Sequence, residues 1–207
     1  MRDHSLPNTS FVVAVALFEG SLAVLAVSLG WVFDVRPLET FHWALSGLGW
    51  GVLAALLLLG LLIASLKWPF RPFAKILEFL EAAILPLFRQ CTVLELAGIS
   101  FLAGLGEELL FRPIVQGGLA RWVGGSWGPV IGLAAAALIF GLLHRITLTY
   151  MLLAGLIGLY LGLLWILTGN LLAPITAHAL YDFLALLYLT KIRPAPKEEA
   201  PPHDLPA

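Results

Sequence analysis

Long apolar runs dominate the chain, and each is close to the length that a helix needs to cross a bilayer. An α-helix rises about 1.5 Å per residue, so roughly 20 residues span a hydrocarbon core about 30 Å thick. A window of this length predicts six transmembrane helices, over Phe11–Val32, Phe41–Leu66, Cys91–Leu110, Trp127–His144, Leu148–Leu167 and Leu171–Thr190. The pattern therefore predicts an all-α fold, a polytopic integral membrane helix bundle.

The first apolar run has the position of a secretory signal peptide, because one arginine and mostly polar residues precede it. Phe11–Val32 is nevertheless as long as a full span, and no small-residue cleavage site of the A-x-A type closes it. We therefore expect this run to be a retained transmembrane helix.

Between the second and third runs lies the segment KWPFRPFAKILEFLEAAILPLFRQ, which mixes basic and bulky apolar residues. Such a mixture is typical of an amphipathic helix along the membrane interface, with an ordinary cytoplasmic connector as the alternative. After Thr190 the composition changes to proline and charge, which predicts a disordered cytoplasmic tail over 191–207. Residues 1–190 are then a single transmembrane domain, with the candidate chemistry in about 91–190.

The composition supports a membrane protein. Hydrophobic residues make up 60% of the chain and charged residues 12%, against about 25% charged residues in a typical soluble domain. The net charge is −1, so no basic surface indicates a nucleic-acid partner. Cys91 is the only cysteine, which excludes a disulfide within the chain and a cysteine-rich zinc site.

The distribution of lysine and arginine predicts the orientation in the cell membrane. If the N-terminus is cytoplasmic, the outside segments hold Arg36 and Arg121. The inside segments hold nine basic residues: Arg2, Lys67, Arg71, Lys75, Arg89, Arg145, Lys191, Arg193 and Lys197. Cytoplasmic loops carry an excess of lysine and arginine, so both termini are predicted to face the cytoplasm.

The third run contains two adjacent glutamates in the segment AGLGEELLFRP. Ionisable residues inside a span are costly and are therefore candidates for function. Arg112 follows Glu108 by four residues, so the two side chains share a helical face and can form a structural ion pair. Glu107 points about 100° away around the helix and has no local cation, which makes it a candidate general base or acid. Pro113 is expected to break or kink this helix.

Two further runs carry polar residues at helical spacing. The fourth ends in FGLLHRI, with Phe140 and His144 four residues apart, and the sixth contains APITAHALYDF, with His178 and Asp182 four residues apart. Each pair lies on one helical face. If the three runs converge, a carboxylate can activate water, one histidine can orient it, and a histidine with a second polar group can stabilise an oxyanion. For each residue a structural packing role is the alternative.

The chain carries three motifs in order, each on a predicted span: Glu107-Glu108-x-x-x-Arg112, Phe140-x-x-x-His144 and His178-x-x-x-Asp182. They resemble the motifs of the CAAX protease and bacteriocin-processing family, also called the Abi family, which includes the CAAX prenyl endopeptidases. The resemblance covers roughly Leu94 to Leu187, and the first two runs carry no motif.

The resemblance implies a glutamate-dependent intramembrane endopeptidase, and we expect the hydrolysis to proceed without a metal. Glu107 matches the glutamate that activates water, with help from His144, and His178 and Asp182 match the oxyanion site. The prenyl endopeptidases have asparagine where this chain has Asp182. An aspartate donates a hydrogen bond only when protonated, so either Asp182 is neutral or it orients His178.

A depth count tests whether these residues can meet. Glu107 and His178 come out at similar depths, roughly 18 and 20 Å from the inner face by the helical rise. Arg145 places His144 nearer the inner surface. The disagreement shrinks if the fourth helix continues past Arg145 or if the third helix breaks at Pro113.

Other functions use the same residues. Glu107, His144 and His178 form the His₂Glu ligand set of a catalytic zinc site, so a zinc-dependent membrane protease is the main alternative. A non-catalytic membrane scaffold or immunity protein is another. A proton-relay transporter is disfavoured because the polar motifs lie in the second half with no repeat in the first. The expected partners are the lipid bilayer and a membrane-associated protein or peptide substrate.

Overall fold

The structure is a computed structural model that describes residues 6–68 and 71–193, and the predicted tail over 194–207 lies outside these ranges. Every secondary-structure element in the described ranges is helical. In chain order they are α1 (Leu6–Val32), α2 (Leu45–Lys67), α3 (Arg71–Phe79), η1 (Leu80–Ile84), α4 (Leu85–Arg89), α5 (Val93–Leu109), η2 (Leu110–Gln116), α6 (Gly117–Val123), α7 (Gly128–Leu143), α8 (Leu148–Thr168), α9 (Leu172–Leu187) and η3 (Tyr188–Ile192). The segments η1, η2 and η3 are π-helical. The predicted all-α bundle is confirmed.

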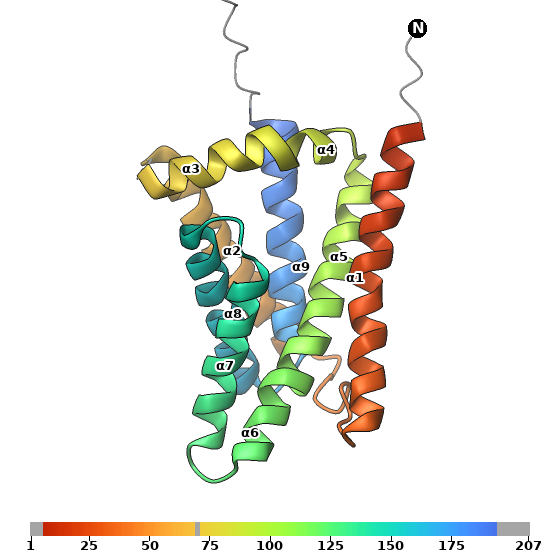
Figure 1. Cartoon of the computed structure of the whole chain (residues 1–207), viewed down its shortest axis with the longest axis vertical. Helices are drawn as coiled ribbons and strands as arrows, with labels where there is room; N and C mark the ends of the chain where they lie inside the picture. The colour runs from red at the N-terminus through yellow and green to blue at the C-terminus, as the bar shows by residue number, and fades with distance from the viewer. Residues whose placement is uncertain (1–5, 69–70, 194–207) are drawn as a thin grey trace, which may run out of the picture.

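Of the six predicted spans, four correspond to described helices that are long and apolar enough to cross a membrane: Thr9–Val32, Leu45–Lys67, Leu148–Thr168 and Leu172–Ile192. The other two predicted runs form the shorter helices α5, with 17 residues, and α7, with 16 residues. The axes of the four long helices are roughly aligned (Figure 1). The start of α1 and the end of η3 lie at the same end of the bundle. The last span extends two residues beyond the predicted Thr190 as the π-helical segment η3. The architecture is that of a polytopic helical membrane protein.

The amphipathic segment forms a roof over one end of this bundle. Helix α3 continues through η1 into α4, and the three lie across the ends of the long helices (Figure 1). Arg193 forms an ion pair with Glu81 of η1, and Lys191 Nζ donates to the backbone oxygen of Arg89 at 2.8 Å. These contacts attach the roof to the end of the last span, which is the position expected for a helix at the membrane interface.

The third run differs from its predicted limits. Thr92 caps α5 in a reciprocal capping box with Glu95. The helix does not end near Leu110. It continues through η2 and α6 to Val123, because the wider π-helical turn over Leu110–Gln116 accommodates Pro113, which has no N–H to donate.

Helix α7 is short, with 16 residues, and forms a hairpin with α8. It begins at the far end of the bundle, and its connection to α8 lies well below the roof (Figure 1). The last residue of the predicted run, His144, is therefore inside the bundle rather than at the surface of the roof end.

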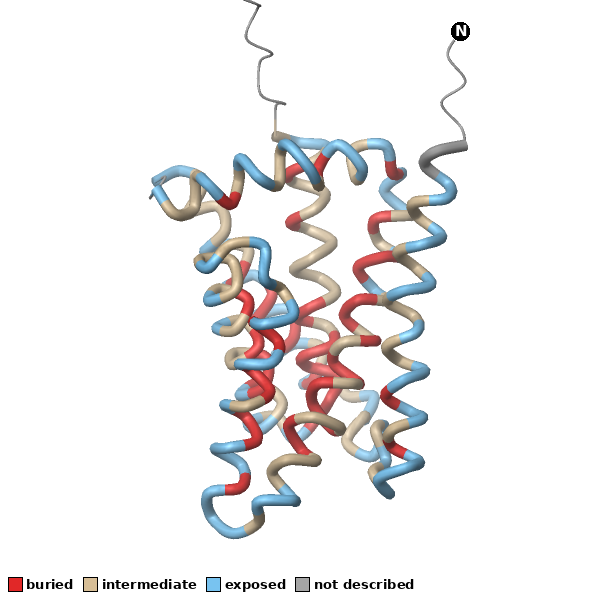
Figure 2. Tube along the Cα trace, viewed as in Figure 1, coloured by how far each residue is buried: buried red, intermediate tan, exposed pale blue. Residues whose placement is uncertain are grey.

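The exposed surface of this protein is apolar, unlike the surface of a soluble protein. Figure 2 shows buried positions concentrated where the helices meet near the middle of the bundle, while α1 is largely exposed along its outer side. The exposed side chains are predominantly large and apolar, such as Phe18 and Leu57. This apolar exterior is what a bilayer covers and what water would not tolerate.

The α1–α2 connection is anchored to the turn between α8 and α9. Asn170 accepts from the backbone N–H of His42 at 3.1 Å and donates to the carbonyl of His42 at 2.8 Å. Trp165 Nε1 donates to Thr40 Oγ1 at 3.0 Å. These contacts close the end of the bundle opposite the roof.

Candidate active site

The site is assembled where α5 crosses α9. A Cβ added at Gly104 would lie 2.7 Å from the backbone nitrogen of Ala179, so the two helices are in backbone contact at this point. Glu107 and Glu108 follow Gly104 by about one turn, and His178 precedes Ala179. A small residue at the crossing therefore brings the glutamate pair against the histidine of the last span.

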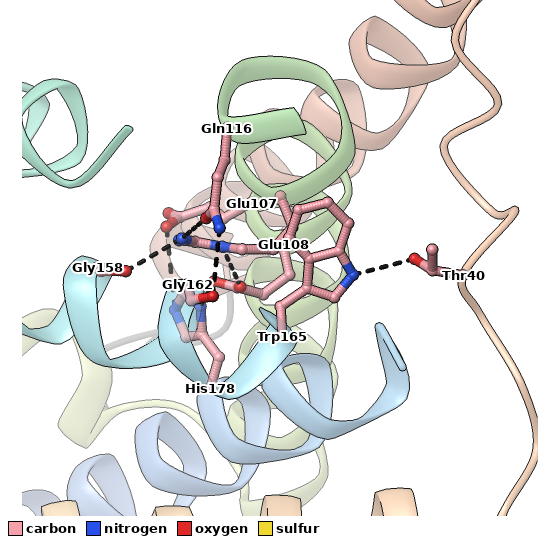
Figure 3. A network of polar contacts seen from close by, with 9 residues as sticks. Thr40, Glu107, Glu108, Gln116, Gly158, Gly162, Trp165 and His178 are labelled. Carbon is pink, nitrogen blue, oxygen red and sulfur yellow. Dashed lines mark hydrogen bonds and ion pairs between the residues drawn. The ribbon is translucent and has the colours of Figure 1, made fainter. Parts of the chain in front are cut away.

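Glu108 and Arg112 form a fully buried ion pair. Arg112 Nε donates to Glu108 Oε2 at 2.7 Å, and both side chains are 0% exposed. The same guanidinium donates from Nη1 to Gln116 at 3.1 Å and to the backbone oxygen of Gly158 at 3.0 Å (Figure 3). Gln116 in turn donates to the backbone oxygen of Gly162 at 3.2 Å. The pairing predicted from the four-residue spacing is present, and α8 supplies carbonyls that the spacing did not indicate.

Glu108 has a second partner. Its Oε1 lies 3.0 Å from His178 Nδ1, so one carboxylate bridges Arg112 and His178 (Figure 3). A carboxylate flanked by these groups accepts hydrogen bonds, and Nδ1 of His178 therefore carries a proton. The other ring nitrogen, Nε2, faces the remaining site residues.

Glu107 lies between the two histidines. Its Oε1 is 3.9 Å from His144 Nε2, its Oε2 is 3.9 Å from His178 Nε2, and its side chain is 12% exposed. Both distances exceed a direct hydrogen bond. Oε2 is buried and has no hydrogen-bond partner among the described residues. Its different direction from Glu108, expected from the helical geometry, is what the structure shows.

His144 reaches this group from the end of α7. Its Nδ1 lies 2.8 Å from the carbonyl oxygen of Phe140, which can only accept, so Nδ1 carries the proton and Nε2 faces Glu107. The His144 ring stacks on Phe140 with centroids 4.4 Å apart. The same phenyl ring meets the His178 ring edge-on at 6.2 Å. The disagreement in depth is resolved because α7 is short, not because it extends past Arg145 or because α5 ends at Pro113.

Asp182 lies on the Nε2 side of His178, with Oδ2 3.4 Å from Nε2. Its side chain is 33% exposed, and it faces a cavity of about 860 Å³. Contact with Nδ1 of His178 is made by Glu108 instead. Asp182 and Glu108 therefore contact opposite nitrogens of one imidazole.

The cavity lies between the roof and the spans α1, α2, α5, α8 and α9, and most of its lining side chains are apolar. Glu19 of α1 lines it together with Asp182. The sequence reasoning missed Glu19, although the signal was present: it is a carboxylate in the middle of an apolar run. Gln116 and Tyr150 were also missed, because they carry no charge.

In the described ranges, no group of three or more histidine, cysteine, aspartate or glutamate residues is arranged to hold a metal ion. The zinc set considered above consists of Glu107, His144 and His178. These residues converge, with Glu107 3.9 Å from each histidine nitrogen.

The fold and this geometry define a polytopic helical membrane protein with a carboxylate–histidine site between its spans. Residues 88–184 match the family described as Type II CAAX prenyl endopeptidase Rce1-like. This region of the chain is therefore similar to the CAAX protease family, in agreement with the motifs. The match covers α5, α7 and α8 and most of α9, which carry the site.

One curated relative has a related region. The uncharacterized protein YpbD of Bacillus subtilis (strain 168) is 32% identical over 96 residues, which are 46% of this chain and 46% of the relative. The chain thus matches about half the length of that relative. No solved structure matches the chain.

Proposed function

We propose that this protein is a glutamate-dependent intramembrane endopeptidase that hydrolyses a peptide bond of a membrane-associated protein or peptide. The observation that carries the proposal is the placement of Glu107 between His144 and His178, at 3.9 Å from each Nε2. Asp182, 3.4 Å from His178 Nε2, connects this group to the cavity that it lines. The Rce1-like match supports the reaction class.

Glu107 and His144 are placed to activate one water molecule without a metal. Atoms 3.9 Å apart are too distant for a direct hydrogen bond, yet a water oxygen can lie within about 2.8 Å of both. Because His144 Nδ1 donates to Phe140, its Nε2 can accept a hydrogen bond from one O–H of that water and so orient it. Glu107 accepts the other proton and serves as the general base.

The reaction then balances with Glu107 as the proton carrier. Water oxygen bonds to the substrate carbonyl carbon while its proton passes to Glu107, and the carbonyl oxygen becomes an oxyanion. As the carbon–nitrogen bond breaks, Glu107 returns the proton to the leaving amine. The products are a new carboxyl terminus and a new amino terminus.

His178 and Asp182 form the proposed oxyanion site. Nδ1–H of His178 donates to Glu108, so donation from Nε2 as well requires the imidazolium form. Asp182 Oδ2 lies 3.4 Å from Nε2. A developing oxyanion takes the place of that contact, and one such donor contributes about 3–4 kcal/mol to lowering the barrier.

We place the roof on the cytoplasmic side of the cell membrane. Lys67, Arg71 and Lys75 lie at or beside the roof helix, and Lys191 and Arg193 lie at the same end of the bundle. This arrangement supports the orientation that the lysine and arginine distribution predicts, with both termini cytoplasmic. Substrate would then enter the cavity from beneath the roof.

The test compares the purified wild-type protein with Glu107→Gln in liposomes that contain a library of membrane-protein segments. Products are identified by mass spectrometry in ¹⁸O-labelled water, because hydrolysis places one label in each new carboxyl terminus. We expect labelled products from the wild type and from Glu39→Gln, an exposed control outside the site, but none from Glu107→Gln. Equal cleavage by Glu107→Gln would contradict the proposal.

A further inference from the structure

Among the residues that the structure describes, the cavity beneath the roof is lined by carboxylates but by no basic side chain. Among its lining residues, the acidic ones are Glu19, Glu78, Glu81 and Asp182, and none is lysine, arginine or histidine. Glu81 is neutralised by its ion pair with Arg193. The inner part of the cavity, next to the site, therefore keeps the carboxylates of Glu19 and Asp182.

Glu19 is held close to the proposed site by its own helix. Its backbone oxygen lies so near Gly106 that a Cβ there would overlap it, and Gly106 directly precedes Glu107. Its Oε2 is buried and has no hydrogen-bond partner among the described residues. Burying an unpaired carboxylate inside an apolar bundle costs free energy, unless a ligand supplies a hydrogen-bond or ion-pair partner.

A second, neutral group points to the same ligand. Ser100 of α5 lines the cavity, is 1% exposed, and its Oγ has no hydrogen-bond partner in the described part of the chain. Buried hydroxyls are normally hydrogen-bonded. A polypeptide segment in the cavity would supply backbone partners for this hydroxyl, which an apolar lipid tail would not.

Among the described residues, Glu19 forms no ion pair with a lysine, arginine or histidine side chain. Arg112 is taken by Glu108, which also holds Nδ1 of His178. The single remaining nitrogen of His178 is shared by Glu107 and Asp182. A cation brought by the ligand would therefore meet Glu19 in surroundings of low dielectric constant, where charge pairing is strong.

We propose that Glu19 binds a lysine or arginine side chain of the substrate. The substrate class is then an apolar, membrane-associated polypeptide with a basic residue near the cleaved bond. This inference rests on the proposed endopeptidase function, because only then is the bound polypeptide a substrate. A substrate that enters with its terminal carboxylate would meet no cationic side chain in the cavity lining.

Binding tests this inference without cleavage. The full chain with Glu107→Gln is placed in nanodiscs and titrated with fluorescent apolar peptides that carry one lysine at successive positions. Matched peptides carry norleucine or glutamate at the same position. We expect the best lysine peptide to bind at least about tenfold more tightly than its norleucine counterpart, as a partly buried charge pair allows.

The variants assign this preference to Glu19. Glu19→Gln on the same background should reduce the lysine-to-norleucine ratio towards one, Glu19→Asp should keep part of it, and Glu39→Gln should keep all of it. Thermal unfolding of each variant checks the fold. An undiminished ratio in Glu19→Gln overturns the inference, as does equal binding of all peptides or tightest binding of the glutamate peptide.

Cleavage of the same peptides by protein with Glu107 intact separates the two proposals. Lysine preference without any cleavage would remove the endopeptidase function and leave the Glu19 site standing. Cleavage that Glu107→Gln abolishes, with no preference for lysine, would do the opposite.

Discussion

Glu108 Oε1 lies 3.0 Å from Nδ1 of His178, on a different span and 70 residues further along the chain. The same carboxylate accepts from Arg112 at 2.7 Å. One buried glutamate therefore fixes both a guanidinium and an imidazole, and its second contact gives it a role that pairing with arginine alone would not. The orientation of His178 depends on this contact, because it determines which ring nitrogen faces Glu107 and Asp182.

Glu108→Gln should lower the rate of cleavage beyond what its loss of stability explains, although it also leaves the buried Arg112 guanidinium without its carboxylate and so lowers the melting temperature. A glutamine amide is neutral and no longer stabilises a charged His178, so we expect kcat to fall by about a hundredfold or more, in the direction seen when the carboxylate behind a catalytic histidine is replaced. Steady-state kinetics and thermal unfolding in detergent measure the two effects. An unchanged kcat would show that Glu108 serves stability alone.

Arg112→Ala should destabilise the protein. It leaves Glu108 buried at 0% exposure without its guanidinium, and breaking one half of a buried pair costs about 3–5 kcal/mol. Denaturation in mixed micelles measures the loss. The double variant Glu108→Gln/Arg112→Met removes both charges and should recover part of the stability. A double variant as unstable as Arg112→Ala would mean that lost packing, not unpaired charge, causes the effect.

Gly104→Val should disrupt the site through the helix crossing. A Cβ at Gly104 already lies 2.7 Å from the Ala179 backbone nitrogen, so a larger side chain must push α5 and α9 apart at a cost of about 1–3 kcal/mol. Cleavage should fall together with stability. Gly98→Ala on the same helix is the matched control, because nothing lies within 4 Å of its added Cβ. Equal behaviour of the two variants would contradict a role for close packing at this crossing.

Metal analysis tests the proposed water activation. We expect purified protein to contain far less than one zinc per chain and to keep its cleavage rate after chelation. A zinc enzyme would instead hold Glu107, His144 and His178 at about 2.0–2.2 Å from one ion. Stoichiometric zinc, with cleavage lost on chelation and restored by zinc, would replace the metal-free mechanism with a metalloprotease.

Reporter fusions test the orientation. A fusion after Thr190 should report from the cytoplasm, and one in the α1–α2 connection near Arg36 should report from the opposite side. The reason is the excess of lysine and arginine at the roof end. An external signal from the fusion after Thr190 would contradict the proposed topology.

The sequence by itself determined the class of the fold and the candidate residues of the site. Long apolar runs require helices in a bilayer, since lipid offers no partners for backbone groups. Ionisable residues within those runs stand out because burying them is costly, and the four-residue spacing indicated the Glu108–Arg112 pair. By the same rule Glu19 was visible in the sequence, but no polar residue three or four positions away on its helix drew attention to it.

Tertiary structure decided which of these residues meet. Local spacing relates groups on one helix, whereas the contact of Glu108 with His178 and the approach of His144 to Glu107 join different spans. Their meeting depends on a 16-residue α7, on a helix that passes Pro113 through a π-helical turn, and on backbone contact at Gly104. These features arise from packing between helices, and the spacing of residues within one helix does not predict such packing.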